Sequence, residues 1–105
     1  MLALVLLTLN VQADGGVLSD NLRIESQHLG YALQYRVYTP TGASATDQLP
    51  SLYVTDGPAY LGHGNFKQVL DAAIVAGEIK PLVVVFVDSR NPDNLEENRR
   101  TAEFM

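Results

Sequence analysis

Two aspartates, Asp56 and Asp88, each directly follow an apolar run that has the pattern of a β-strand. In an open parallel sheet, ligands bind beyond the carboxyl ends of the strands. The segments 56–60 and 88–91 are therefore where substrate-binding groups are expected. Aspartate at the end of a strand also commonly organises a turn, and that alternative stays open for both side chains.

Thiol and metal chemistry have little support in the sequence. The chain has no cysteine, which excludes a thiol nucleophile, a disulfide framework and a cysteine-containing zinc site. His28 and His63 stand in polar turn and loop segments. Even together, His63 and Asp56 supply only two ligands, fewer than a metal site needs. We expect neither a metal nor a cofactor.

An antiparallel hairpin is expected to precede these segments. Residues 22–26 and 31–38 alternate with period two, which predicts two half-buried strands. The turn between them contains Gly30, as a short hairpin connection often does. On the second strand, one face carries Tyr31, Leu33, Tyr35 and Val37, and the other carries Ala32, Gln34, Arg36 and Tyr38.

A strand–helix–strand unit is expected to follow the polar loop at 39–50. Residues 51–55 form a strand that ends at Asp56-Gly57-Pro58. A helix then begins after Asn65 and ends near Gly77. Its apolar face carries Phe66, Val69, Leu70, Ala73 and Ile74. The six apolar residues 82–87 are typical of a buried strand of a parallel sheet. The unit predicts a right-handed crossover and a parallel pair of strands.

The tail after Asp88 is polar, and residues 95–105 are predicted to begin a helix. Arg99, Arg100 and Glu103 could form ion pairs at the start of that helix and hold a loop over the site. Surface ion pairs of this kind are worth little on their own, so a purely structural role is the alternative.

Composition bounds the class of protein. The chain has 105 residues, of which 47% are apolar, enough for one small domain with a packed core. The net charge is −5, and the longest basic cluster is Arg99-Arg100. Nucleic acid and anionic lipid both require a basic surface, so neither is an expected partner.

The first thirteen residues are predicted to be a signal peptide. An apolar run at 2–9 is followed by Val11-Gln12-Ala13, which places small residues where a signal peptidase reads them. The run is too short for a stable membrane anchor. We expect a secreted or periplasmic protein with a mature domain at 14–105, and a cytoplasmic one if the leader is not cleaved. A buried first strand or helix is the alternative.

Four stretches together resemble the putative esterase family, which is related to esterase D and includes the enterochelin esterases. They are residues 49–58 (LPSLYVTDGP), 75–81 (VAGEIKP), 82–90 (LVVVFVDSR) and 97–104 (ENRRTAEF), and the resemblance spans roughly residues 22–105. It implies an α/β-hydrolase fold. The expected fold class is therefore α/β, with an antiparallel hairpin leading into strand–helix–strand of a parallel sheet, the N-terminal half of such a hydrolase.

The resemblance also implies a serine esterase whose catalytic residues are expected beyond Met105. Such enzymes carry a Gly-x-Ser-x-Gly nucleophile elbow between a strand and a helix, followed by an acid and a histidine. None of the five serines has these flanking glycines. Ser44, in Gly42-Ala-Ser-Ala-Thr46, is half a match but lies in a polar loop. The chain as given is therefore expected to be inactive and to end before the elbow.

One part of the implied catalytic machinery is expected within the chain. The oxyanion hole takes a backbone N–H from the loop after the third strand, which is here 56–60. Pro58 has no N–H, so Gly57 and Ala59 are the candidate donors. Asp56 and Tyr60 are candidates for lining the substrate pocket. A simple tight turn at Gly57-Pro58 is the alternative.

The function implied is hydrolysis of a small-molecule carboxylic ester by the full-length protein, enterochelin esterase-like. A non-catalytic ligand- or carbohydrate-binding domain on the same fold is the alternative. Neither the particular ester nor the oligomeric state follows from the sequence.

Overall fold

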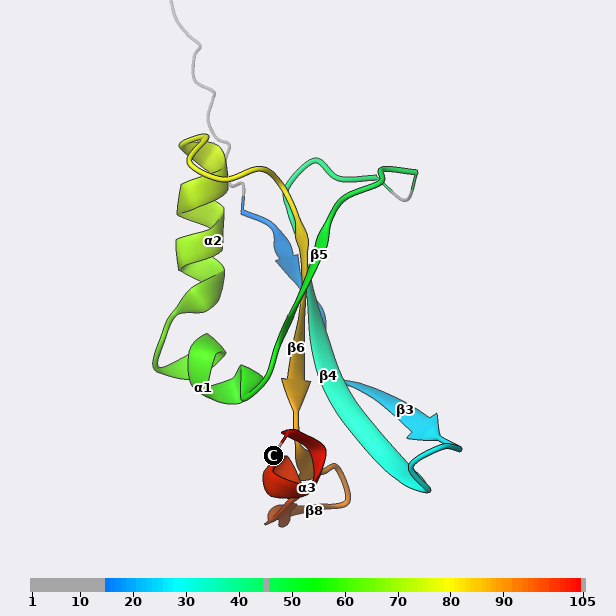
Figure 1. The fold of residues 1–105 in the computed structure, drawn as a ribbon. Helices are drawn as coiled ribbons and strands as arrows, with labels where there is room; N and C mark the ends of the chain where they lie inside the picture. The colour runs from blue at the N-terminus through cyan, green and yellow to red at the C-terminus, as the bar shows by residue number, and fades with distance from the viewer. Residues whose placement is uncertain (1–14, 45, 105) are drawn as a thin grey trace, which may run out of the picture.

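A computed structural model of the chain describes residues 15–44 and 46–104. The predicted leader at 1–13 lies outside these segments. The main sheet contains β2 (Val17–Leu18), β3 (Leu22–Ser26), β4 (Tyr31–Thr39), β5 (Ser51–Val54) and β6 (Val83–Asp88). Its order is β2-β4-β6-β5, and β3 also pairs with β4 (Figure 1).

The strand pairing confirms both predicted units. β3 and β4 form an antiparallel hairpin in which Ile24 lies opposite Leu33. β5 and β6 are parallel, with Tyr53 opposite Val85. The other side of β6 pairs antiparallel with β4, so the apolar strand is central and the sheet is mixed. Mixed sheets of this kind are common in large α/β folds.

Two helices link β5 to β6 and lie on one face of the sheet: α1 (Gly57–Gly62) and α2 (Phe66–Val75). The periodic face of α2 is confirmed at Leu70, which is 4% exposed, but Val69 is 53% exposed. Gly77, just beyond α2, has φ 74°, the left-handed conformation that favours glycine at a helix end.

The core lies between α2 and the sheet. Its buried members are Tyr38, Leu70, Val84 and Phe86. The face of β4 that carries Ala32, Gln34 and Tyr38 is thus the buried one. The more apolar face, with Leu33 and Tyr35, is turned away from both helices.

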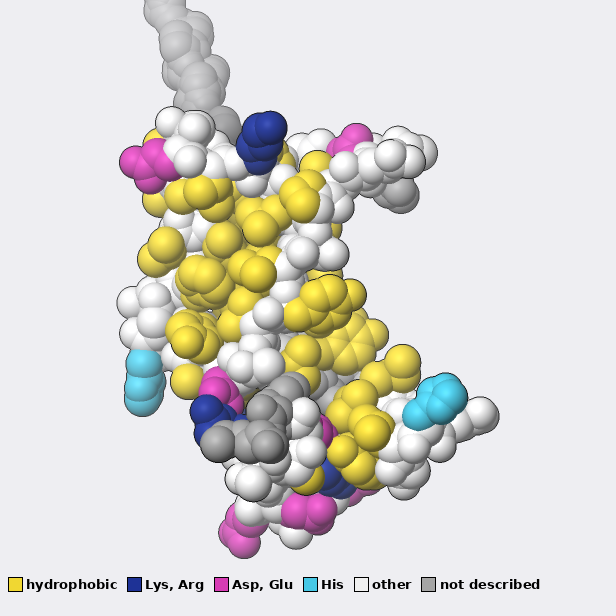
Figure 2. Space-filling view, viewed as in Figure 1, with side chains coloured by type: hydrophobic (Ala, Val, Ile, Leu, Met, Phe, Trp, Pro, Cys, Tyr) yellow, Lys and Arg dark blue, Asp and Glu magenta, His cyan; other side chains and the backbone are white. Residues whose placement is uncertain are grey.

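That second face, which we call the uncovered face, continues across four strands. It consists of Leu22, Ile24, Leu33, Tyr35, Val37, Tyr53, Val85 and Val87, as the strand registers require. Tyr53 is 68% exposed and Ile24 is 50% exposed. A hollow of about 320 Å³ lies over part of it. Figure 2 shows hydrophobic side chains beside the hollow on the right of the molecule, near β4 and β5.

The predicted helix start at 95–98 is wrong. Residues 90–98 form a hairpin of β7 (Arg90–Asn91) and β8 (Asn94–Asn98), and α3 (Arg100–Phe104) begins only afterwards. Asparagine side chains explain the difference, because they bind nearby backbone groups and compete with helix formation. The side-chain Oδ1 of Asn94 accepts from the Glu96 N–H at 3.2 Å, and the side-chain Oδ1 of Asn98 accepts from the Arg100 N–H at 2.9 Å.

Asp71 of α2 ties Gly16, just before β2, and Tyr38 of β4 to the helix. It accepts hydrogen bonds from the Tyr38 hydroxyl at 2.7 Å, the Gly16 N–H at 2.8 Å and the Lys67 ammonium at 2.7 Å. Burial alone would raise the pKa of Asp71, but the hydrogen bonds from Lys67, Tyr38 and Gly16 outweigh it and lower the pKa. Burial, aided by the bond to Asp71, raises the pKa of Tyr38.

Asp71→Ala is expected to lower the free energy of unfolding at neutral pH by about 1–3 kcal/mol, because the buried Tyr38 hydroxyl loses its acceptor. Because the folded-state pKa of Asp71 is lowered, its contribution is present above the ordinary carboxylate pKa and is lost as pH falls through the folded value. Urea unfolding at neutral and acidic pH should therefore show a difference that shrinks in acid. Lys67→Ala is the control, with a cost of about 0.5 kcal/mol. A difference independent of pH would contradict this account.

Candidate active site

The end of β5 is where the sequence places the candidate site. Asp56 has φ 56° and ψ 39°, left-handed values that are uncommon outside glycine, and α1 begins at the next residue, Gly57. The segment expected as a loop or tight turn is therefore mostly helix. Pro58 fits there because the first turn of a helix needs no N–H partner.

Gly57 is buried against the central strand. A Cβ built on Gly57 would lie 2.8 Å from the Cβ of Phe86, closer than real Cβ atoms approach one another. Only glycine lets the backbone after β5 pass this close to β6. The sequence signal was a glycine directly after a strand end, and the structure gives it this physical reason.

The two candidate oxyanion donors are not equivalent. The Ala59 N–H donates to the Asp56 carbonyl at 3.1 Å, so the first turn of α1 already uses it. Gly57 is the first residue of the helix, where an N–H has no partner within the helix. This geometry favours Gly57.

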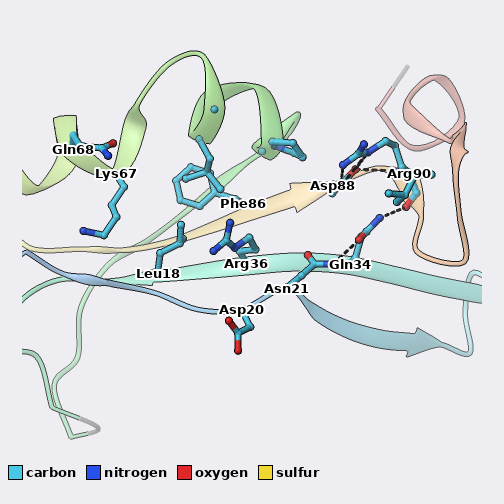
Figure 3. Close-up of a pocket in the computed structure, with 15 residues that line it drawn as sticks. Leu18, Asp20, Asn21, Gln34, Arg36, Lys67, Gln68, Phe86, Asp88 and Arg90 are labelled. Carbon is cyan, nitrogen blue, oxygen red and sulfur yellow. Dashed lines mark hydrogen bonds and ion pairs between the residues drawn. The ribbon is translucent and has the colours of Figure 1, made fainter.

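A cavity of about 650 Å³ lies between the sheet and the two helices. Gly57 lines it, together with side chains that include Leu18, Arg36, Lys67 and Phe86 (Figure 3). Its size is that of a small-molecule pocket.

The candidate pocket residues Asp56 and Tyr60 do not line that cavity. Tyr60 is 51% exposed, and its ring centroid lies 5.9 Å from that of Phe66. The Asp56 carboxylate instead forms an ion pair with Arg100. The Arg100 Nε donates to both carboxylate oxygens, at 2.9 Å and 3.0 Å. The ion pairs expected at the helix start are thus made with residues outside α3.

Asp88, the other strand-end aspartate, organises the turn after β6. It accepts from the Arg90 N–H at 3.0 Å and from the Arg90 guanidinium at 2.6–3.2 Å. The bond to Asp88 raises the pKa of Arg90. Asp88 also lines the cavity, but its charge is balanced within the turn.

Asn21 and Gln34 were not singled out from the sequence. The Asn21 side-chain amide donates to the side-chain Oε1 of Gln34 at 2.6 Å. The Gln34 side-chain amide in turn donates to the backbone carbonyl of Arg90 at 2.9 Å. Gln34 is 3% exposed and lines the cavity. The sequence pattern that could have identified Gln34 is a glutamine on the strand face that also carries Ala32 and Tyr38.

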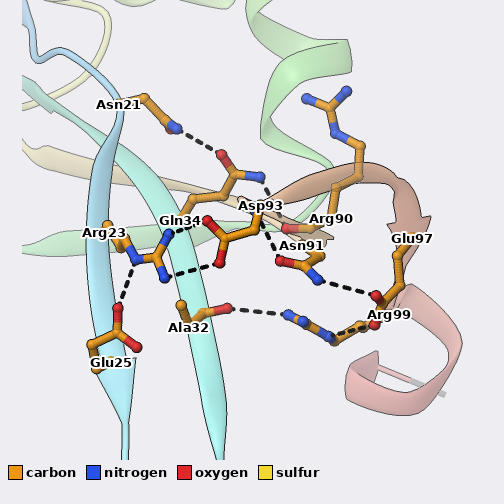
Figure 4. A network of polar contacts seen from close by, with 10 residues as sticks. All are labelled: Asn21, Arg23, Glu25, Ala32, Gln34, Arg90, Asn91, Asp93, Glu97 and Arg99. Atoms are coloured by element: carbon orange, nitrogen blue, oxygen red, sulfur yellow. Dashed lines mark hydrogen bonds and ion pairs between the residues drawn. The ribbon is translucent and has the colours of Figure 1, made fainter.

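A polar network fastens the segment after β6 to the β3–β4 hairpin (Figure 4). Arg23 donates to both carboxylate oxygens of Asp93, at 2.7 Å and 3.1 Å. The Arg99 guanidinium lies 3.8 Å from the centroid of the Tyr31 ring and donates to the Ala32 carbonyl at 3.1 Å. The network holds the polar tail beside the carboxyl ends of β5 and β6.

The remaining candidates lie apart from this site. His28 is in the turn between β3 and β4, and His63 directly follows α1. Ser44 lies in the polar loop, where its hydroxyl is 3.0 Å from that of Thr46. Within residues 15–44 and 46–104, no group of three or more side chains suited to a metal ion is found. The helices of these segments are all too short or too polar to cross a bilayer.

The family profile described as "Putative esterase" matches residues 26–104. Among solved structures, a ferulic acid esterase is similar with a TM-score of 0.65 and 20% identity, over 75% of this chain and 33% of that one. The feruloyl esterase module from Clostridium thermocellum, a mutant complexed with sinapinate, is similar with a TM-score of 0.63 and 21% identity, over 76% and 29%. No match is found among curated proteins.

These likenesses bear on the fold. At such identities they show that the mixed sheet with its helices has the architecture of esterase folds. The chain spans about a third of the length of the solved structures it resembles.

Proposed function

Because the chain belongs to the putative esterase family, as its match over residues 26–104 shows, we propose that the protein hydrolyses carboxylic esters. The observation that carries the proposal is this match together with Gly57, a buried glycine at the end of β5, on the wall of a cavity of about 650 Å³. A backbone N–H in that place can donate to the negative oxygen that forms when an ester carbonyl is attacked.

In the proposed mechanism, a serine attacks the ester carbonyl and forms an acyl-enzyme, which water then hydrolyses. Gly57 supplies one oxyanion donor. The nucleophile, its general base and the acid lie beyond Met105, in the part of the α/β-hydrolase fold that follows this N-terminal portion. The absence of any Gly-x-Ser-x-Gly in the 105 residues supports this division.

Two lines of support bear on the proposed substrate class. The sequence resembles the enterochelin esterases, whereas the similar solved structures are named ferulic acid and feruloyl esterases. Both names point to esters with a phenolic ring in the acid part of the molecule, so that ring is the common element. A panel with a feruloyl ester, a catecholate ester and p-nitrophenyl acetate separates these readings by kcat/KM.

The chain by itself is expected to show no turnover of p-nitrophenyl acetate or butyrate, since it lacks a nucleophile elbow. Ser44→Ala should leave the background rate unchanged. Turnover that Ser44→Ala abolishes would contradict the proposed division of the catalytic groups.

The coding sequence downstream of Met105 gives an independent test. A strand followed by Gly-x-Ser-x-Gly supports the esterase. A frame that continues without such an elbow supports a ligand- or carbohydrate-binding domain instead.

We further propose that residues 1–13 are a cleaved leader and that the protein is exported. N-terminal sequencing of the protein recovered from its native source should then begin at Asp14. A sequence that begins at Met1 would contradict export by this route and favour the cytoplasm.

A further inference from the structure

Asp56 is held in an uncommon backbone conformation without local help. A non-glycine residue at φ 56° and ψ 39° is disfavoured, and aspartate usually occupies this region by bonding its own neighbouring backbone. Here the Asp56 side chain makes no capping bond to α1. Its two carboxylate oxygens instead accept from Arg100, 44 residues further along the chain.

Arg100 is itself held in place from its own side. The Asn98 side chain accepts the Arg100 N–H at 2.9 Å, and the preceding residue, Arg99, stacks on Tyr31 at 3.8 Å. The pair Asp56–Arg100 therefore ties the turn after β5 to the tail that follows β6. The two segments lie at the same edge of the sheet.

Gly57 directly follows Asp56, so the peptide that carries its N–H is the one that this ion pair restrains. The other side of Gly57 is restrained by contact with Phe86. We propose that Arg100 is a positioning residue, which acts through Asp56 to aim the Gly57 N–H at the substrate oxygen. The inference rests on the proposed function, in which Gly57 is an oxyanion donor.

A structural role would have different consequences. The Arg100 and Asp56 side chains are 52% and 34% exposed, and pairs this exposed contribute little to stability. A misdirected donor, in contrast, weakens an interaction made in the transition state, and loss of such a donor altogether costs about 10²–10³-fold in kcat. Activity and stability therefore separate the two roles.

The test uses the full-length protein and steady-state kinetics on the best ester of the panel. Arg100→Ala is expected to lower kcat about tenfold, a partial loss of the donor, with KM changed less than about twofold. Arg100→Lys keeps the charge but not the planar fork, and should recover part of kcat. Added salt should lower the wild-type kcat towards that of Arg100→Ala and leave the variant unchanged.

Glu25→Ala is the matched control. It removes another exposed arginine–carboxylate pair, Arg23–Glu25 at 2.6 Å, and leaves the Arg23–Asp93 pair that fastens the tail in place. It should leave kcat and KM unchanged, with a change in melting temperature similar to that of Arg100→Ala. Equal losses of kcat in both variants, or no loss in Arg100→Ala, would overturn the positioning role.

Hydrogen exchange gives a readout independent of turnover. Arg100→Ala should speed exchange of the Ala59 amide, which donates to the Asp56 carbonyl, severalfold, and Glu25→Ala should not. If the wild-type protein hydrolyses no ester, the proposed function fails and the catalytic role fails with it. The exchange rates then still decide whether Arg100 holds the turn at Asp56. Unchanged exchange in Arg100→Ala would reject that as well.

Discussion

Phe86→Ala is expected to lower the free energy of unfolding by about 3–5 kcal/mol. Phe86 is 1% exposed at the centre of β6, and its ring meets the Phe66 ring edge-on, with centroids 5.7 Å apart. Truncation leaves a void beneath α2 and removes the surface on which Gly57 rests. Since small domains are stable by only about 5–15 kcal/mol, this loss takes a large share of the total.

Urea denaturation followed by circular dichroism measures this effect. Val85→Ala is the matched control, because Val85 adjoins Phe86 in β6 but its side chain lies on the uncovered face. It should cost less than half as much as Phe86→Ala. Equal costs would mean that both faces of β6 are packed alike, contrary to the architecture described above.

The chain expressed as residues 14–105 is expected to self-associate at micromolar concentration through its uncovered face and the edge of β5. Apolar side chains of four strands share this face, and β5 is the edge strand beside it. An exposed, apolar strand edge is a template for pairing with another chain. Burying one large apolar side chain contributes about 1.5–3 kcal/mol, so a few such contacts suffice for association.

The double variant Ile24→Lys, Tyr53→Lys should weaken that association at least about tenfold, because both side chains are at least half exposed and support no core contact. Size-exclusion chromatography with light scattering over a concentration series measures it. Leu29→Lys, a change of similar character in the turn after β3, is the control. A wild-type chain that stays monodisperse and monomeric throughout would contradict the prediction.

The sequence predicts the elements whose pattern is local. The hairpin, the helix after Asn65 and the parallel pair of β5 and β6 all follow from periodicity and from strand–helix–strand order. It does not reveal which face of β4 is buried, since Leu33 and Tyr35 are more apolar than Ala32 and Gln34. The position of α1 and α2 decides that, and it is a tertiary property.

The tail shows a second limit. Residues 94–98 have no alternation of apolar and polar side chains, and β8 forms because asparagine side chains and Pro92 shape the turns around it. No pattern at 95–98 distinguishes such a strand from a polar helix.

Part of the candidate site is also predictable from local sequence patterns. A glycine after a strand end identifies Gly57, and the missing N–H of proline removes Pro58. Ala59 is lost as a donor because α1 begins directly after Asp56 and its first turn uses the Ala59 N–H. The Gly-Pro sequence does not predict that helix. The partnership of Asp56 with Arg100 depends on the path of the chain between them, since the two residues are 44 positions apart.

The pairing of β4 with β6 also has a consequence for synthesis on the ribosome. Residues 34–38 pair with residues 84–88, so about fifty further residues must be synthesised before β4 gains the partner strand on its other side. At about 5–20 residues per second, that interval lasts several seconds. During it, the β3–β4 hairpin has already been made, but the edge of β4 that will pair with β6 has no partner strand. The nascent chain is therefore most exposed to capture by a chaperone in the interval that ends when β6 emerges.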